Sequence, residues 1–102
     1  MGKNRIIKSL GKVIGNVVVH KILFKYTNNP KSVHHLTAEV GTYRDNAIEI
    51  AQEFNWNEED KQRIKQEAIK EFGKRITKYS DVKFPTEESD KILDETIKEC
   101  VI

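Results

Sequence analysis

Apolar residues recur at alternating steps of three and four along residues 33–54, and this spacing constrains the fold more than any other feature of the sequence. The stripe consists of Val33, Leu36, Val40, Tyr43, Ala47, Ile50 and Phe54. Such spacing lines one face of an α-helix over three heptads. Asn29 followed by Pro30 is typical of a helix start, because Asn caps free amides and Pro is tolerated at the first helical position. We therefore predict a helix over about residues 30–54, which Gly41 weakens by ~1 kcal/mol without interrupting the stripe.

Two further helices are predicted downstream. Asn57 is a second N-cap, and three acidic residues follow it in the first turn, where negative charge interacts favourably with the helix dipole. Apolar residues on one face extend this helix to about Lys78. A loop with the sequence YSDVKFP separates it from a last helix that begins at Thr86. The last helix carries the apolar stripe Ile92, Leu93, Ile97, Cys100 and Val101.

The opening segment allows two interpretations. On a helical wheel, residues 5–18 divide into an apolar arc and an opposite arc that contains Arg5, Lys8 and Lys12. Over residues 17–26 the apolar side chains are no longer confined to one side of the helical wheel. This segment is rich in β-branched and aromatic residues, so it could form a strand. The sequence contains no second strand pattern, and a lone strand would leave its backbone groups unpaired. We therefore predict a helix over about residues 4–26, with a second half so apolar that several helices or a second subunit must cover it.

The length and composition are consistent with one helical domain. A chain of 102 residues can bury a single core. Charged residues make up 33%, with only five glycines and two prolines, which favours long solvated helices, and the regular apolar spacing argues against disorder. We predict an all-α fold over residues 1–102, a small antiparallel bundle of about four helices. Its basic N-terminal helix either packs in the bundle or acts as a detachable arm.

The expected location is the cytoplasm. The only cysteine, Cys100, excludes a disulfide framework and a cysteine metal cluster within the chain, and a reducing compartment is expected. Lys12 and Asn16 interrupt what would be the apolar part of a signal peptide, so secretion is not expected. No run of the sequence approaches the ~20 apolar residues of a membrane span.

Charge is distributed unevenly along the chain. Before Glu39 there are seven cationic residues and no acidic one, whereas the rest of the chain has eleven cationic and sixteen acidic residues. The basic segment could simply lie on the acidic remainder. Alternatively, the cations at the start of the chain could contact an anionic partner; they are Lys3, Arg5, Lys8 and Lys12. These side chains could neutralise phosphates with release of counterions, lie on an anionic membrane surface, or contact an acidic protein. The sequence alone favours none of these partners.

Four other features are candidates for contacts within the bundle or with a partner. Gly11 and Gly15 form a small-xxx-small pair that lets another backbone approach closely, and a helix crossing inside the bundle is its simplest interpretation. Phe24 lies near the end of the first predicted helix. Trp56 lies at a helix junction, where it either packs over the end of the bundle core or serves as an anchor for a partner. Tyr43 is predicted to be a core residue with a polar tip.

No catalytic constellation is evident in the sequence. His35 and Glu39 are one helical turn apart and could both face a metal, but metal sites usually need three or four ligands. The acidic residues fall in first turns and on polar faces, where solvation explains them. We therefore expect no enzyme activity, no metal, no cofactor and no small-molecule substrate.

The sequence predicts a macromolecular interaction module. We expect it to bind another protein or to form a homodimer, and the alternative is a polyanion-binding protein that uses its cationic first helix on a membrane surface or a nucleic-acid backbone. The candidate partner-binding residues are Lys3, Arg5, Lys8, Lys12, Phe24 and Trp56.

Overall fold

The computed structural model describes residues 3–26, 30–79 and 82–101, and for residues 30–40 it describes the backbone only. Within these ranges the chain forms four α-helices, one 3-10 helix and no strand, which confirms the predicted all-α bundle. The elements are α1 (Lys3–Tyr26), α2 (Pro30–Ala51), α3 (Glu58–Ile76), η1 (Thr77–Tyr79) and α4 (Thr86–Cys100).

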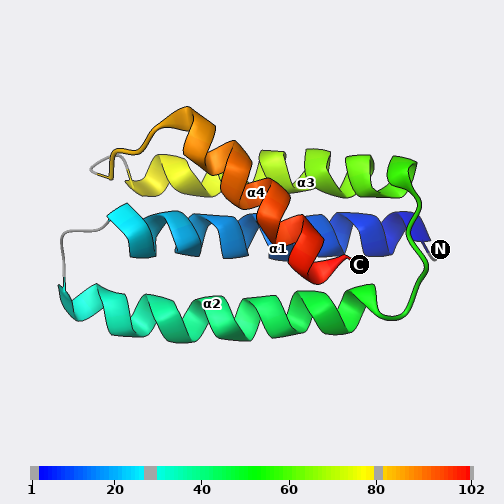
Figure 1. Ribbon diagram of the computed structural model, residues 1–102, viewed down its shortest axis with the longest axis horizontal. Helices are drawn as coiled ribbons and strands as arrows, with labels where there is room; N and C mark the ends of the chain where they lie inside the picture. The colour runs from blue at the N-terminus through cyan, green and yellow to red at the C-terminus, as the bar shows by residue number, and fades with distance from the viewer. Residues whose placement is uncertain (1–2, 27–29, 80–81, 102) are drawn as a thin grey trace.

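α1 is the central helix of the bundle. Figure 1 shows α2 and α3 on opposite sides of α1, with α4 crossing obliquely over it. α1 and α2 run antiparallel, whereas α1 and α3 run parallel, because the segment after α2 carries the chain across the N-terminal end of α1. Over the described residues, α2 and α3 consequently make no contact with each other. This order differs from a simple up-and-down bundle, in which successive helices are neighbours.

The helix boundaries lie close to the predicted ones, except at the end of α2. α1 remains helical through Tyr26, which excludes a strand over residues 17–26. At the start of α3, the Asn57 side chain accepts a hydrogen bond from the Asp60 amide at 2.8 Å, and the Asp60 carboxylate accepts one from the Asn57 amide. α2 ends at Ala51, before the predicted end at residue 54, and the Phe54 ring packs against the next aromatic residue instead of continuing the stripe.

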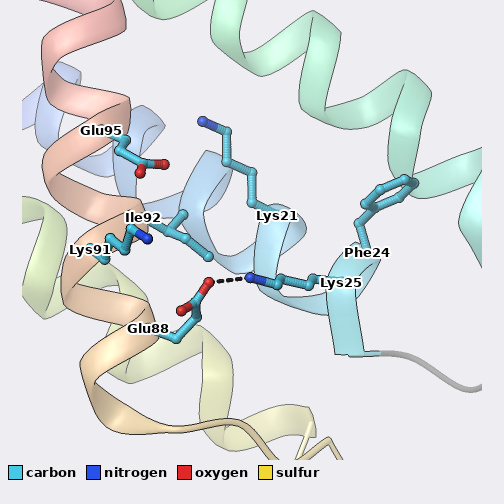
Figure 2. A pocket seen from close by; sticks show the side chains of 7 residues that line it. All are labelled: Lys21, Phe24, Lys25, Glu88, Lys91, Ile92 and Glu95. Atoms are coloured by element: carbon cyan, nitrogen blue, oxygen red, sulfur yellow. Dashed lines mark hydrogen bonds and ion pairs between the residues drawn. The ribbon is translucent and has the colours of Figure 1, made fainter.

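α4 is attached to the other helices by ion pairs as well as by apolar contacts. Lys21 of α1 donates a hydrogen bond to the Thr96 hydroxyl at 2.9 Å, and Figure 2 shows Lys25 of α1 bound to Glu88. Lys21 and Lys25 of the basic first helix therefore do lie on acidic residues from the rest of the chain. These side chains are partly exposed, so each pair contributes little free energy by itself. Among the described residues, the ion pairs between α4 and the other helices are Lys25–Glu88, Lys21–Glu99 and Lys65–Asp94.

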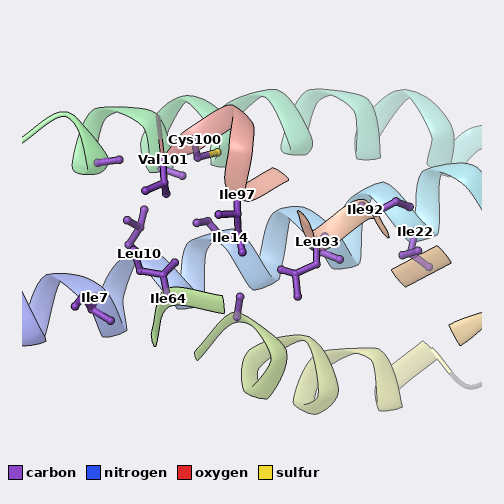
Figure 3. Close-up of a cluster of buried hydrophobic side chains, with 14 residues drawn as sticks. Ile7, Leu10, Ile14, Ile22, Ile64, Ile92, Leu93, Ile97, Cys100 and Val101 are labelled. Carbon is purple, nitrogen blue, oxygen red and sulfur yellow. The ribbon is translucent and has the colours of Figure 1, made fainter. Parts of the chain in front are cut away.

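The core is built around α1. Leu10, Ile14 and Ile22 are completely buried, and Figure 3 shows them surrounded by apolar side chains of α3 and α4. Partners of this cluster are Ala47, Ala51, Ile64, Ala68, Ile92, Leu93, Ile97, Cys100 and Val101. In the second half of α1, Val19 and Leu23 also lie against Phe72, Ile76 and Val82. The apolar residues of this half are thus covered by more than one neighbouring element, as predicted, whereas Phe24 remains 45% exposed.

At Gly11 and Gly15, α1 packs directly against α3. A Cβ atom at Gly15 would lie 2.8 Å from the Ala68 carbonyl oxygen and 2.8 Å from the Glu71 Cβ, and one at Gly11 would overlap the Glu67 Cβ. No larger side chain fits without moving the helices apart. The small-residue pair is therefore a helix crossing inside the bundle.

Candidate functional site

One side of α1 remains open and is cationic over the first half of the helix. Arg5, Lys8 and Lys12 are exposed, and they make no ion pair with any residue that the structure describes. α1 contains no acidic residue, so its own helix supplies no partner. α2, α3 and α4 all contact α1 and cover its other sides.

A fourth cation, from α3, lies beside these three. The Arg63 guanidinium donates a hydrogen bond to the Asn4 side-chain oxygen at 2.7 Å. Asn4 is one helical turn before Lys8, so this bond holds Arg63 next to the cationic side of α1. We name Arg5, Lys8, Lys12 and Arg63 the cationic face. Sequence reasoning missed Arg63, because its position depends on α3 running parallel to α1.

Lys3 and Trp56 are engaged in contacts within the chain at the end of the bundle. The Lys3 Nζ lies 2.6 Å from a carboxylate oxygen of Asp60 and 5.5 Å from the centroid of the Trp56 ring. The Trp56 indole donates a hydrogen bond to the Ala51 carbonyl at 2.8 Å. The hydrogen bond from Lys3, supported by the Asn57 amide, lowers the pKa of Asp60 despite the opposing effect of desolvation. Trp56 is half-buried, and these contacts close the end of the core.

Phe24 borders a groove between α1 and α4. Phe24 is 45% exposed, so its ring is accessible to a ligand in this groove. The groove has a volume of about 430 Å³. Figure 2 shows its two walls, with Lys21, Phe24 and Lys25 on α1 and the remaining side chains on α4. We name it the α1–α4 groove, and its α4 residues are Glu88, Lys91, Ile92 and Glu95.

Ion pairs fix the charges on part of the groove rim. The hydrogen bond between Lys25 and Glu88 is the largest cause of a lowered pKa for Glu88 and of a raised pKa for Lys25, so both stay charged at neutral pH. Lys91 and Glu95, in contrast, are exposed and have no ion-pair partner among the residues described. They are the charges of the groove that remain available to a ligand.

The described side chains offer little for metal or nucleophilic chemistry. Across residues 3–26, 41–79 and 82–101, no three His, Cys, Asp or Glu side chains are grouped as a metal site. The hypothesis of a metal at His35 and Glu39 concerns side chains outside this description. Cys100 is buried, and desolvation raises the pKa of its thiol to about 11, so the thiol stays protonated at neutral pH.

Among the described helices, none combines the length and the apolar character needed to cross a bilayer. Comparisons with family models, with curated proteins and with solved structures found no match for this chain. The described residues thus offer two candidate binding surfaces, the cationic face and the α1–α4 groove.

Proposed function

We propose that the protein is an interaction module that binds a helical segment of a partner protein in the α1–α4 groove. The observation that carries the proposal is the exposed ring of Phe24 beside a groove of about 430 Å³. Large apolar anchors at the centre of a contact surface supply most of the affinity in protein interfaces. A groove between two helices is also a common receptor for an amphipathic helix.

The lining of the groove defines the chemistry of the partner. Phe24 and Ile92 form its apolar part, and the Lys25–Glu88 pair stabilises one wall. Lys91 and Glu95 lie one turn apart on α4 with opposite charges. A matching partner helix presents one apolar side chain to Phe24, flanked by an acidic and a basic residue one turn apart.

The same lining argues for binding rather than catalysis. It contains no histidine, cysteine, serine or tyrosine, and two of its carboxylate and ammonium groups are bound to each other. Nucleophilic or general acid–base catalysis needs a reactive group held near a base.

The decisive variant is Phe24→Ala, with Ile69→Ala as its matched control. Ile69 lies on α3 and is 47% exposed, so both substitutions remove a similarly exposed apolar side chain. Burial of the exposed ~90 Å² of Phe24 by a partner contributes about 2 kcal/mol to the free energy of binding, which corresponds to roughly a thirtyfold change in affinity. We expect affinity capture with the full chain to recover a protein that wild type and Ile69→Ala retain and that Phe24→Ala loses. Calorimetry with the purified partner then measures the ratio.

Charge reversal provides an independent test. Lys91→Glu should weaken the same complex, whereas Lys98→Glu, two turns further along α4 and outside the groove, should leave it unchanged. Sedimentation of wild type and Phe24→Ala over a range of concentrations shows whether the partner is a second copy of the chain. Equal binding by Phe24→Ala and Ile69→Ala would contradict the proposal.

A further inference from the structure

The cations of α1 divide into two groups with different environments. Lys3, Lys21 and Lys25 each bind a carboxylate of α3 or α4. Arg5, Lys8 and Lys12 are exposed, and none of them reaches a carboxylate within the described part of the chain. Self-complementarity of charge therefore accounts for the first group and not for the second.

The cationic face is held in shape by the bundle. Steps of three and four residues place Arg5, Lys8 and Lys12 on one side of α1 over about 10 Å of helix. Arg63 is fixed beside them by its 2.7 Å hydrogen bond to Asn4. A duplex carries roughly three phosphates of each strand per ~10 Å of its axis. Four cations on two packed helices are thus similar in number to the phosphates that such a length of duplex presents on one strand.

The position of α1 argues against insertion into a membrane interface. An interfacial helix buries its apolar side among lipid chains. In this bundle the apolar side of α1 is already covered, with Leu10 and Ile14 fully buried. The exposed large apolar residues that the structure describes are Phe24, Ile69 and Tyr79, and none of them belongs to the cationic face. Lipid insertion would therefore require α1 to leave the core.

The same absence of apolar groups limits what the face can recognise. Single-stranded nucleic acids are bound by aromatic side chains that stack on bases, and duplex sequence is read by side chains that reach base edges. The cationic face consists of long cationic side chains on a helical surface. We propose that the cationic face binds the phosphate backbone of duplex nucleic acid without reading its sequence, while α1 stays in the bundle.

Fluorescence anisotropy with labelled 20-base-pair duplexes tests this inference. The full-length protein is titrated onto two duplexes of unrelated sequence at several NaCl concentrations. Three or four neutralised phosphates predict that affinity falls roughly 40- to 150-fold between 50 and 200 mM salt, with equal affinities for both sequences. Affinities that differ more than tenfold between the two sequences would overturn backbone-only binding.

A pair of double variants locates the binding surface. Lys8→Gln/Lys12→Gln removes two charges from the cationic face, and Lys78→Gln/Lys98→Gln removes two exposed charges from η1 and α4, so both have the same net charge. The first variant should reduce the slope of log affinity against log salt concentration by about 2. The second variant should leave this slope close to the wild-type value. Circular dichroism melting of both variants verifies that the bundle is intact.

Two competitors distinguish nucleic acid from other anionic partners. We expect the duplex to bind better than vesicles with 30% phosphatidylserine and better than poly-glutamate at the same concentration of charge. Stronger binding to either competitor would assign the face to a membrane surface or an acidic protein and overturn the inference. So would the absence of duplex binding at 50 mM salt, or equal salt slopes for the two double variants.

Discussion

Replacing Gly15 by alanine tests the close crossing of α1 and α3. The added Cβ would lie 2.8 Å from both the Ala68 carbonyl oxygen and the Glu71 Cβ, about 0.6 Å closer than ordinary van der Waals contact. One of these atoms belongs to the α3 backbone, so a side-chain rotation does not relieve the overlap. The two helices have to separate along their shared core.

The expected cost follows from two opposing effects. Overpacking a buried contact costs about 1–3 kcal/mol. Alanine is a better helix former than glycine by about 1 kcal/mol, which partly offsets that cost. Gly73→Ala provides the reference, because its Cβ would meet no atom within 4 Å and only the gain in helix propensity remains. The difference in unfolding free energy between the two variants should therefore be about 1–3 kcal/mol, with Gly73→Ala the more stable.

Urea unfolding measures this difference directly. Trp56 is the only tryptophan, and its half-buried ring at the bundle end reports unfolding by fluorescence, while circular dichroism reports loss of helix. Coincident transitions from the two probes establish two-state behaviour. A difference of 2 kcal/mol corresponds to roughly 8–16 °C in melting temperature for a domain of this size. If Gly15→Ala gains as much stability as Gly73→Ala, the close packing of α1 on α3 is refuted.

Three further outcomes follow from the structure. The folded-state pKa of Glu88 lies below its ordinary 4.5, so the Lys25 pair stabilises the fold above that value and is lost as pH falls through the folded pKa. Wild type should therefore lose more stability between pH 5 and 3 than Glu88→Gln does, as measured by urea unfolding. Cys100 should react slowly with a disulfide reagent at pH 8 and faster as urea is added, and rapid labelling of the native protein would contradict its burial. Asn57→Ala should cost about 1 kcal/mol in thermal or urea unfolding because it removes the cap of α3, and an unchanged stability would exclude a stabilising capping box.

Several parts of this fold were accessible from the sequence because they depend on residues close together in the chain. The Asn57 cap involves residues three apart, and the apolar stripe of the last helix repeats every three or four residues. The second half of α1 was predicted to need several neighbours, since Val17, Val18 and Val19 together cover more than one side of a helix. The end of α2 was not predicted correctly, because Trp56 binds the Ala51 carbonyl and Phe54 turns toward Trp56.

The candidate sites could be predicted only in part from the sequence. Arg5, Lys8 and Lys12 were identified as a cationic side of one helix, and they do share an exposed surface. The sequence did not separate them from Lys3, which looked equivalent but binds Asp60. The groove beside Phe24 also has no signature in the sequence, because its walls come from helices that are far apart in the chain.

The sequence by itself determined the helices, their amphipathic sides and the excess of cations in the first of them. These properties arise from spacings of up to four residues, and the helical repeat converts such spacings directly into geometry. Only the tertiary structure decided which cations are neutralised and which remain free. Lys21 meets Glu99 across 78 positions of the chain, and Arg63 reaches Asn4 across 59, because α4 and α3 both pack against α1. Contacts of that kind depend on the order and direction in which the helices pack, which local periodicity does not encode.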